Sequence, residues 1–394
     1  MLPGRAPPPK TRSFSLRSRA VRGLLYQLLA LAVVILGVWF LADNTLENMR
    51  TRGIQSGFDF LGQPAGFDIG ETLIPYESMR PYWQAFLVGV VNTLRVAIVG
   101  IVLTTLLGTL LGIGRFSSNA LVRGFCYAYV ELFRNVPILL QLLVWYLLLT
   151  EWLPNADTAL SAFGLVFLSK GGLSYPVPVG GLAHGLAVLG AVAGGVGAWA
   201  WARLARAHFQ RTGQTRAVAL PGLGFVLLGC VLGWAAGGAP TDWNVPTQAE
   251  AAVVDGAALT PEFLAVLFGL VFYTAAFVAE VVRAGIASVP RGQTEAAESL
   301  GLPKGHTMRL VVLPQALRVI IPPMTNQYLN LTKNSSLAVA IGYPDVVSIS
   351  NTAINQTGRA VECIAIIMLV YLTTSLSTSA IMNWYNRRAA IKER

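Results

Sequence analysis

Residues 295–314 read EAAESLGLPKGHTMRLVVLP, and this polar stretch between long apolar segments decides how the C-terminal third of the chain folds. Residues 293–300 are rich in Ala, Glu and Leu, which favour a helix. Gly301 can end that helix, and Pro303 cannot continue it. The stretch therefore predicts a short helix that stops at Gly301.

A second short helix is expected after this stop, from about residue 304 to residue 312, and it should end at Pro314. Two short helices joined at a glycine form an L-shaped knob. Ala296 and Ala297 give one face of the knob a low profile that fits a cleft. The polar rim is supplied by Glu295, Glu298, Lys304 and Arg309. An ordinary connecting loop without a partner is the alternative.

The composition is that of a polytopic membrane protein. Of 394 residues, 54% are hydrophobic and 12% are charged, whereas about a quarter of the residues of soluble domains are charged. The net charge of +10 would suit nucleic acid, but the basic residues flank apolar segments, where they act as topology signals. Cys126, Cys230 and Cys363 lie within apolar segments, which indicates small buried side chains rather than disulfides or a metal site.

Crossing a bilayer takes about 20 apolar residues, and eight segments are long and apolar enough, or nearly so. They are residues 24–43, 84–114, 124–150, 183–203, 217–236, 262–284, 332–350 and 360–384. The seventh is the weakest, because Asn334, Ser335 and Asp345 interrupt it. The first follows a basic N-terminus without a clear cleavage site, which favours an uncleaved span over a signal peptide.

Basic residues are concentrated on alternate loops. Residues 1–23 hold six basic residues and no acids, and residues 203–216 hold four arginines and no acids. Residues 237–261 hold three acids and no Lys or Arg. The positive-inside rule therefore predicts cytoplasmic termini, an even number of spans and a cytoplasmic loop 285–331.

The chain divides into a core interrupted by an insertion. The expected regions are 1–82 (basic N-terminus, first span and periplasmic segment), 83–150 (core, first part), 151–260 (insertion with two helices), 261–385 (core, second part, with the polar loop at about 290–316) and 386–394 (basic tail). Gly190 and Gly194 in the insertion, and Gly108 and Gly112 in the second span, have a spacing that allows close helix packing. Glycine as plain filler of apolar helices is the alternative.

Four stretches resemble, in order, the type I ABC-transporter permeases of the polar amino acid family. They are GVVNTLRVAIVGIVLTTLLGTLLG (89–112), ELFRNVPILLQLLVWY (131–146), YTAAFVAEVVRAGIASVPRGQTEAAESLG (273–301) and LTKNSSL (331–337). Residues 295–314 then resemble the family's EAA loop. The extra first span and the insertion resemble the larger permease subunits of general amino acid and glutamate/glutamine/aspartate/asparagine importers.

This resemblance implies an all-α, inner-membrane fold of about eight transmembrane helices with an N-terminal extra helix and a two-helix insertion. It implies a sister permease in a heterodimer, an ATP-binding subunit dimer and a periplasmic amino-acid-binding protein as partners. ATP and Mg would bind the partner ATPase, so this chain would be a non-catalytic subunit. The function implied is import of polar L-amino acids by alternating access.

The resemblance also implies roles for individual residues. The coupling residues would be Glu295, Ala296, Ala297, Gly301, Pro303, Leu313 and Pro314. Polar residues in apolar surroundings are costly and therefore mark candidates for the translocation path. These candidates are Arg95, Glu131, Arg134, Gln141, Glu280, Arg283, Asn330, Lys333, Asn334 and Ser335. Capping and hydrogen bonding between helices is the alternative for residues 330–335.

Several charges also have a structural interpretation. Glu131 and Arg134, like Glu280 and Arg283, are three residues apart and can pair on one helix face. Arg95 can either reach the membrane surface or meet a carboxylate in a polar cavity.

The sequence contains no P-loop pattern G-x-x-x-x-G-K-[ST], no metal-ligand spacing and no hydrolase motif. The competing functions are an ion-coupled secondary amino acid transporter and a non-transporting membrane scaffold. The former would need no ATPase and gives no reason for the polar knob.

Overall fold

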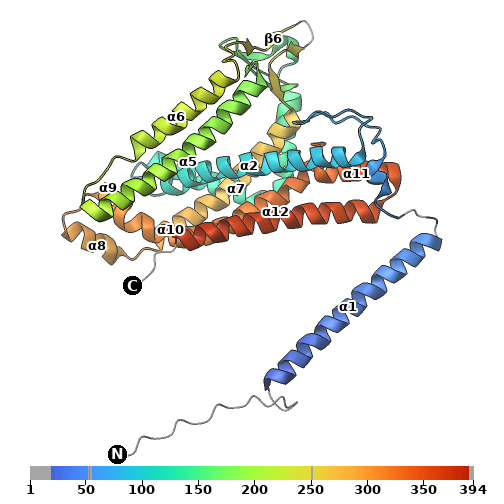
Figure 1. Ribbon diagram of the computed structural model, residues 1–394, viewed down its shortest axis with the longest axis horizontal. Coiled ribbons are helices and arrows are strands. Elements are labelled where there is room, and N and C mark those ends of the chain that lie inside the picture. The colour runs from blue at the N-terminus through green and yellow to red at the C-terminus, as the bar shows by residue number, and fades with distance from the viewer. Residues whose placement is uncertain (1–18, 52, 54–55, 250–251, 390–394) are drawn as a thin grey trace, which may run out of the picture.

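The computed structural model describes residues 19–389 except 52, 54–55 and 250–251, and it is mostly helical (Figure 1). The α-helices are α1 (Arg19–Thr51), α2 (Tyr82–Gly114), α3 (Ala120–Asn135), α4 (Ile138–Leu147), α5 (Gly181–Thr212), α6 (Ala219–Ala236), α7 (Pro261–Ala287), α8 (Arg291–Ser299), α9 (Lys304–Thr307), α10 (Leu313–Asn334), α11 (Val346–Thr357) and α12 (Ala360–Ala389). Within the described residues, six helices are long and apolar enough to cross a membrane, or up to eight spans if each of two bent pairs is one span. The prediction of about eight spans is therefore confirmed. Most of the basic N-terminus and of the basic tail, at 1–18 and 390–394, lies outside the described residues.

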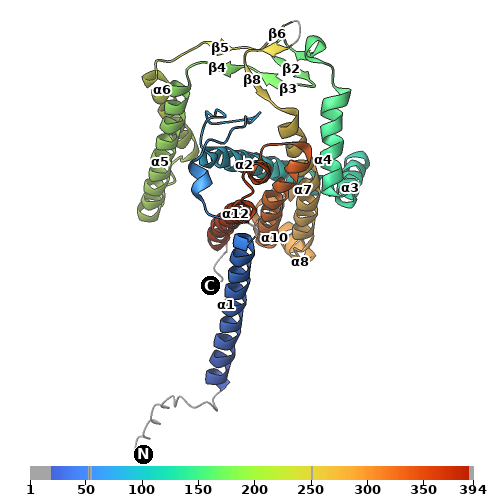
Figure 2. The same ribbon diagram turned by 90° about the vertical axis from the view of Figure 1, so that its right-hand side faces the viewer.

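Helices α2 and α7 pack against each other at the centre of the body (Figure 2). A Cβ atom on Gly108 of α2 would lie 2.5 Å from Cγ1 of Val278 in α7, and one on Gly112 would lie 2.8 Å from the Ala279 carbonyl oxygen. Helices α4 and α10 pack on α7, and α11 packs on α2. These two glycines thus permit a close crossing that a larger residue would prevent.

The third predicted span, residues 124–150, is not one helix. Helix α3 meets the stretch Ile138–Trp152 at 105°, because Pro137 cannot continue α3 and holds the preceding Val136 extended. Gln141 is buried, and its Nε2 donates to the carbonyl oxygens of Phe133 and Val136, both at 2.9 Å. The last carbonyl groups of a helix have no partner within the helix. At this bend, the Gln141 side chain supplies the partner for two of them.

The seventh predicted span, residues 332–350, is misplaced. Helical structure runs from Lys304 to Ile341, through a π-helical turn (Met308–Val312), α10 and a 3-10 helix (Ser335–Ile341), and meets α11 at 49°. The expected cytoplasmic loop to residue 331 is therefore shorter than predicted, because α10 packs against α7 and α12.

The sequence predicted that Pro314 would end the second short helix of the knob, but it does not. Pro314 is the second residue of α10, directly after the π-helical turn Met308–Val312, and the helical structure continues through it. Pro322 and Pro323 also lie inside α10 without ending it. The prolines in this segment therefore shape one helix rather than divide it.

The insertion folds as a helical hairpin with short strands at one end. A Cβ atom on Gly190 of α5 would lie 2.0 Å from the Gly229 carbonyl oxygen of α6, and one on Gly194 would lie 2.2 Å from the Phe225 carbonyl oxygen. The expected two helices are present and packed backbone to backbone. The close-packing interpretation of the glycines is thus correct.

Eight short strands, which the sequence did not predict, flank this hairpin. They are β1 (Leu160–Ala162), β2 (Val166–Ser169), β3 (Gly172–Tyr175), β4 (Val177–Pro178), β5 (Trp243–Asn244), β6 (Thr247–Gln248), β7 (Val253–Val254) and β8 (Ala257–Leu259). They form a four-stranded sheet, β1-β2-β3-β8, and the pairs β4-β5 and β6-β7, all antiparallel. The strands connect the hairpin to the body (Figure 2).

Helix α1 stands apart from the body (Figure 1). None of the residues in the most apolar 18-residue stretch of α1 is buried. A 3-10 helix, η1 (Asp59–Gly62), follows it, and Phe60 of η1 is buried against α2.

Candidate functional site

The corner of the elbow formed by α8 and α9 is fixed by backbone hydrogen bonds. Gly301 has a φ of +77°. The Leu302 N–H donates to the Ala297 carbonyl at 3.1 Å, and the Gly301 N–H donates to the Glu298 carbonyl at 2.9 Å. This pair of bonds is a helix-ending motif that favours glycine at the left-handed position. The predicted helix stop at Gly301 is confirmed.

The outer surface of the elbow is open. Glu295, Ala296 and Pro303 are exposed, and Leu300 is 83% exposed. Ala297 is only 4% exposed, so one of the two alanines expected on the low face packs inside the elbow instead.

The elbow is attached to the membrane body through α10. Helix α9 runs through the π-helical turn into Leu313, which is 40% exposed, and Pro314, which is partly buried. Gln315 of α10 donates to the Gln293 side chain of α8 at 3.3 Å. The elbow is thus joined to α10 by continuous helical structure and by this side-chain hydrogen bond.

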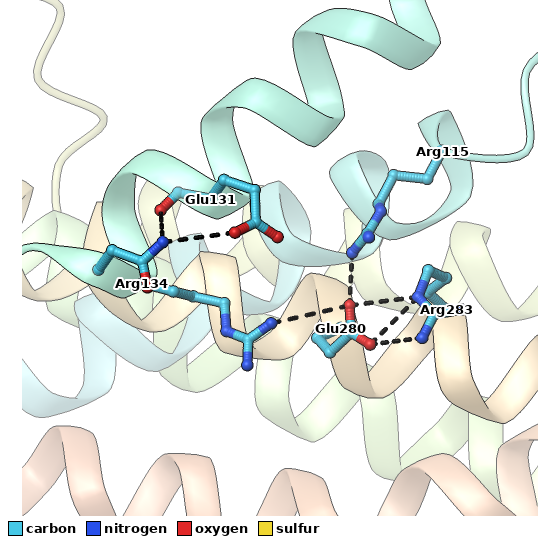
Figure 3. A network of polar contacts seen from close by, with 6 residues as sticks. Arg115, Glu131, Arg134, Glu280 and Arg283 are labelled. Carbon is cyan, nitrogen blue, oxygen red and sulfur yellow. Dashed lines mark hydrogen bonds and ion pairs between the residues drawn. The ribbon is translucent and has the colours of Figure 1, made fainter.

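A charged cluster lies toward the C-terminal end of α7, with Glu280 at its centre (Figure 3). The Glu280 carboxylate accepts from Arg283 at 2.5 Å and from Arg115 at 2.5 Å. Arg134, at the end of α3, approaches the same carboxylate to 4.0 Å. One carboxylate therefore joins the ends of α2, α3 and α7, and the four groups together carry a net positive charge.

The predicted pair of Glu280 and Arg283 is confirmed, but the predicted pair of Glu131 and Arg134 does not form. Glu131 accepts instead from the Asn135 side chain, at its carbonyl oxygen (2.7 Å) and its carboxylate (3.3 Å). Arg134 turns toward Glu280 and lies over the Phe277 ring at 5.4 Å. Sequence reasoning missed Arg115, although an arginine directly after the apolar α2 was a visible signal.

A cavity of about 230 Å³ adjoins this cluster between α7 and α10. Arg134 and Glu280 line it from one side, and Pro323 and Gln327 line it from α10. The four positions Pro323, Gln327, Asn330 and Asn334 are spaced by three or four residues, so they share one face of α10. A polar stripe therefore leads from the cluster along α10.

The predicted polar segment at the end of α10 is partly exposed and partly used for structure. Asn330 and Lys333 are exposed, Asn334 is half-buried, and Lys333 forms none of the ion pairs found among the described residues. Ser335 is buried, and its hydroxyl donates to the Thr332 carbonyl at 2.7 Å. Leu331 packs on Gly100, which is near the middle of α2, so this segment lies at about mid-depth of the body.

A second charged cluster lies at the opposite end of the body. Arg95 of α2 pairs with Glu71, and Glu71 also accepts from the Thr260 hydroxyl at the start of α7. The Arg95 guanidinium lies 4.1 Å from the centre of the Phe263 ring. Of the two interpretations of Arg95, the structure supports the carboxylate partner. Glu71 and Thr260 line an adjacent cavity of about 340 Å³.

Within the described ranges, no group of three or more His, Cys, Asp or Glu side chains is placed to hold a metal ion. The arrangement instead offers a protruding elbow, two charged clusters and a polar stripe between them. Such features suit the movement of a solute and the transmission of force rather than bond-making chemistry.

Comparisons with known proteins agree with this picture. Residues 100–391 match the family model described as "Binding-protein-dependent transport system inner membrane component". The chain is 42% identical over 382 residues to the general L-amino acid transport system permease protein AapQ of Rhizobium johnstonii, covering 95% of this chain and 93% of the relative. It is 46% identical over 388 residues to the putative amino-acid ABC transporter permease protein YhdX of Escherichia coli, covering 97% and 98%.

A third relative also matches along nearly its full length. The glutamate/glutamine/aspartate/asparagine transport system permease protein BztB of Rhodobacter capsulatus is 37% identical over 405 residues, and the match covers 95% of each chain. The similarity therefore extends through the first span and the insertion as well as the core.

Proposed function

We propose that this chain, which belongs to the family of binding-protein-dependent transport system inner membrane components, moves polar L-amino acids across the bacterial inner membrane as the permease subunit of an ABC importer. The substrate class is supported by the names of three near-full-length relatives, all of them amino acid permeases. As a member of this family the chain is a non-catalytic, multi-pass inner-membrane component. Family membership also removes the reason to consider an ion-coupled secondary transporter or a scaffold.

The partners proposed are a sister permease, a dimer of ATP-binding subunits and a periplasmic amino-acid-binding protein. ATP and Mg bind the ATP-binding subunits in this proposal, and the exposed elbow docks on one of them. The observation that supports this most directly is the elbow itself, because its corner is capped by backbone hydrogen bonds while Glu295, Ala296 and Leu300 remain exposed. A stiff, open corner that continues into a membrane helix is suited to receive force from another subunit.

The orientation proposed places the elbow and both termini in the cytoplasm. The basic loop between α5 and α6, the elbow and the C-terminal end of α12 all lie toward one end of the body in Figure 1. The inner Glu280 cluster then lies near the cytoplasmic surface, and the Arg95–Glu71 cluster lies near the periplasmic one.

The translocation path proposed follows the polar stripe of α10. Asn330, Lys333 and Asn334 offer donors and acceptors at mid-depth, where exposed polar groups require water or protein partners. The Lys333 ammonium suits the carboxylate of an amino acid, and the Asn330 and Asn334 side chains suit its ammonium. Alternating access follows when the ATP-binding subunits favour one arrangement of the helices over the other.

The proposed coupling is tested at Gly301. A Cβ atom there meets nothing within 4 Å, so Gly301→Asp acts by straining the left-handed backbone and by adding a charge at the corner. We expect substrate-stimulated ATP hydrolysis and uptake by the assembled complex to fall together, while the amount of complex is retained.

The matched control is Gly305→Asp, which adds the same charge to the same elbow at a glycine with ordinary φ and open surroundings. Gly301→Asn has nearly the same shape as Gly301→Asp and a similar tolerance of the left-handed region but adds no charge, so recovery of activity in this variant would assign the loss to the charge at the corner. If Gly301→Asp leaves uptake and stimulated hydrolysis intact, the coupling role of this corner is wrong.

A further inference from the structure

An open groove of about 510 Å³ runs between α2 and α12, with Thr332 of α10 lining it. Its walls are formed by Val90, Leu94, Ile98 and Ile101 of α2 and by Leu369, Thr373, Ser377 and Ile381 of α12. On each helix these positions recur every three or four residues, so each wall is one continuous helix face. Ile98 is 61% exposed and Leu369 is 63% exposed, so the groove is open to a further element.

The outer end of the same α2 face is already covered, and the covering segment directly follows α1. Phe60 of η1 is 1% exposed. Its ring packs on Tyr82 and Phe86, with centroid distances of 5.5 and 6.4 Å. Tyr82 and Phe86 precede Val90 by two turns and one turn, so the groove continues a face that the N-terminal segment already occupies.

Residues 57–60, which cover part of α2, also bind the start of α12, the helix that forms the other wall of the groove. The Gly57 N–H donates to the Glu362 carboxylate at 2.6 Å, and Arg359 donates to the Gly57 carbonyl at 3.0 Å. Arg359 also pairs with Asp59 at 3.1 Å. Arg359 and Glu362 lie at the start of α12, so residues 57–60 are fastened to both helices that form the groove.

Helix α1 is confined near this point. Five residues separate Thr51 from Gly57, so the two ends lie within about 20 Å of each other even when the chain is fully extended. A helix of 33 residues is about 50 Å long and one of 30 residues is about 45 Å long, so α1 and α12 match in length. In Figure 1 the C-terminal end of α1 and the start of α12 lie toward the same end of the molecule, and α1 then runs away from the body.

One face of α1 is suited to close packing. Gly23, Ala30 and Gly37 recur every seven residues, and neither glycine has an atom within 4 Å of its Cβ position. Small residues on one helix and hydroxyl side chains on another are common at helix contacts in lipid. The groove supplies the hydroxyls, from Thr373, Ser377 and their neighbours.

We propose that α1 docks in the groove between α2 and α12 of its own chain when the protein lies in a bilayer. The helix continues inward from the anchor at residues 57–60 and covers the α2 and α12 faces that η1 leaves open. This face of the permease is therefore closed by the subunit itself, and the sister permease binds elsewhere.

Disulfide cross-linking in the complete complex in membranes tests this docking. The three native cysteines are replaced by alanine, and a protease site replaces residues 52–56. Val34→Cys, Gly37→Cys or Leu41→Cys on α1 is combined with Ser377→Cys on α12, because a disulfide needs Cα atoms within about 7 Å. The control combines the same α1 cysteines with Leu228→Cys on α6, a residue that is 57% exposed.

We expect at least one pair with Ser377→Cys to hold α1 on the cleaved chain until a reductant is added, several times more efficiently than the Leu228→Cys control. Cross-linking of α1 to the sister permease would overturn the proposal. So would release of α1 in every Ser377→Cys pair, which would leave the groove to lipid, or preferred cross-linking to α6.

Discussion

Helices α2 and α7 and helices α5 and α6 both approach each other at glycines, yet the two pairs bury different surfaces. In the first pair, Gly108 receives the Val278 side chain, and 67% of the most apolar window of α7 is buried. In the second pair, the backbones of the two helices touch at Gly190 and Gly229. Only 17% of the residues in the most apolar 18-residue stretch of α5 are buried, and 0% of those in α6. Close contact between two helices therefore does not by itself mean that they are buried in the core of the protein.

The largest effect on amino acid uptake is expected from a substitution at Gly108. Gly108→Val places methyl groups where Val278 lies, and overpacking of this kind costs about 1–3 kcal/mol or more. We expect little assembled complex and near-background amino acid uptake, measured in membranes from cells expressing all subunits. Gly124→Val is the control, because a Cβ atom at Gly124 meets nothing within 4 Å; equal loss in both variants would contradict the assignment of α2–α7 as the essential contact.

Removing the charge of Glu280 tests the same difference between the core helices and the α5–α6 hairpin. Glu280→Gln leaves Arg115 and Arg283 without their carboxylate. An unsatisfied buried hydrogen-bonding group costs about 1–3 kcal/mol and a charged one more, and the cost is reduced here because the Glu280 side chain is 27% exposed. We expect uptake to fall by roughly tenfold, since about 1.4 kcal/mol is a factor of ten.

The hairpin offers the matched comparison for this charge. Arg203 of α5 lies 3.9 Å from the centre of the Trp199 ring, and Arg203→Gln should leave uptake nearly unchanged. Wild-type uptake by Glu280→Gln would show that the cluster does not hold the inner ends of α2, α3 and α7 together.

The smallest effect on uptake is expected inside the hairpin, despite the tighter contact. Gly190→Val forces α5 and α6 apart, which should speed proteolysis of the loop at residues 213–218. Uptake should stay within about twofold, as for changes away from the functional body. Gly195→Val is the control for proteolysis, because a Cβ atom there meets nothing within 4 Å. A loss of uptake as severe as that of Gly108→Val would place the hairpin in the working body.

The features that the sequence predicted correctly depend on near neighbours in the chain. The end of α8 is made by the Gly301 N–H bonding three residues back and the Leu302 N–H bonding five residues back, and Glu280 pairs with Arg283 one turn away. The spans with unbroken apolar runs were also found, because hydropathy is a local property.

The features that were missed depend on distant segments or on unusual helix geometry. The partner of Arg95 is Glu71, from a non-helical loop that no periodicity places. The seventh span was misplaced because its polar end, at residues 334–336, continues as a 3-10 helix rather than stopping. The 105° angle of the bend at Pro137 was missed because residues 124–150 are one largely apolar run, and hydropathy does not register the two hydrogen bonds by which Gln141 satisfies the carbonyls at the bend.

The uninterrupted helical stretch from Lys304 to Ile341 has a mechanical consequence. At about 1.5 Å per residue it extends for about 55 Å. It would therefore act as one long lever with the elbow at its end. In the proposed orientation, a tilt of a few degrees at the elbow would become a shift of several ångströms at Asn334 and Ser335, because helical structure joins them without a loop. Pro322 and Pro323 lie within this helical stretch, and prolines inside a helix are where it bends most easily.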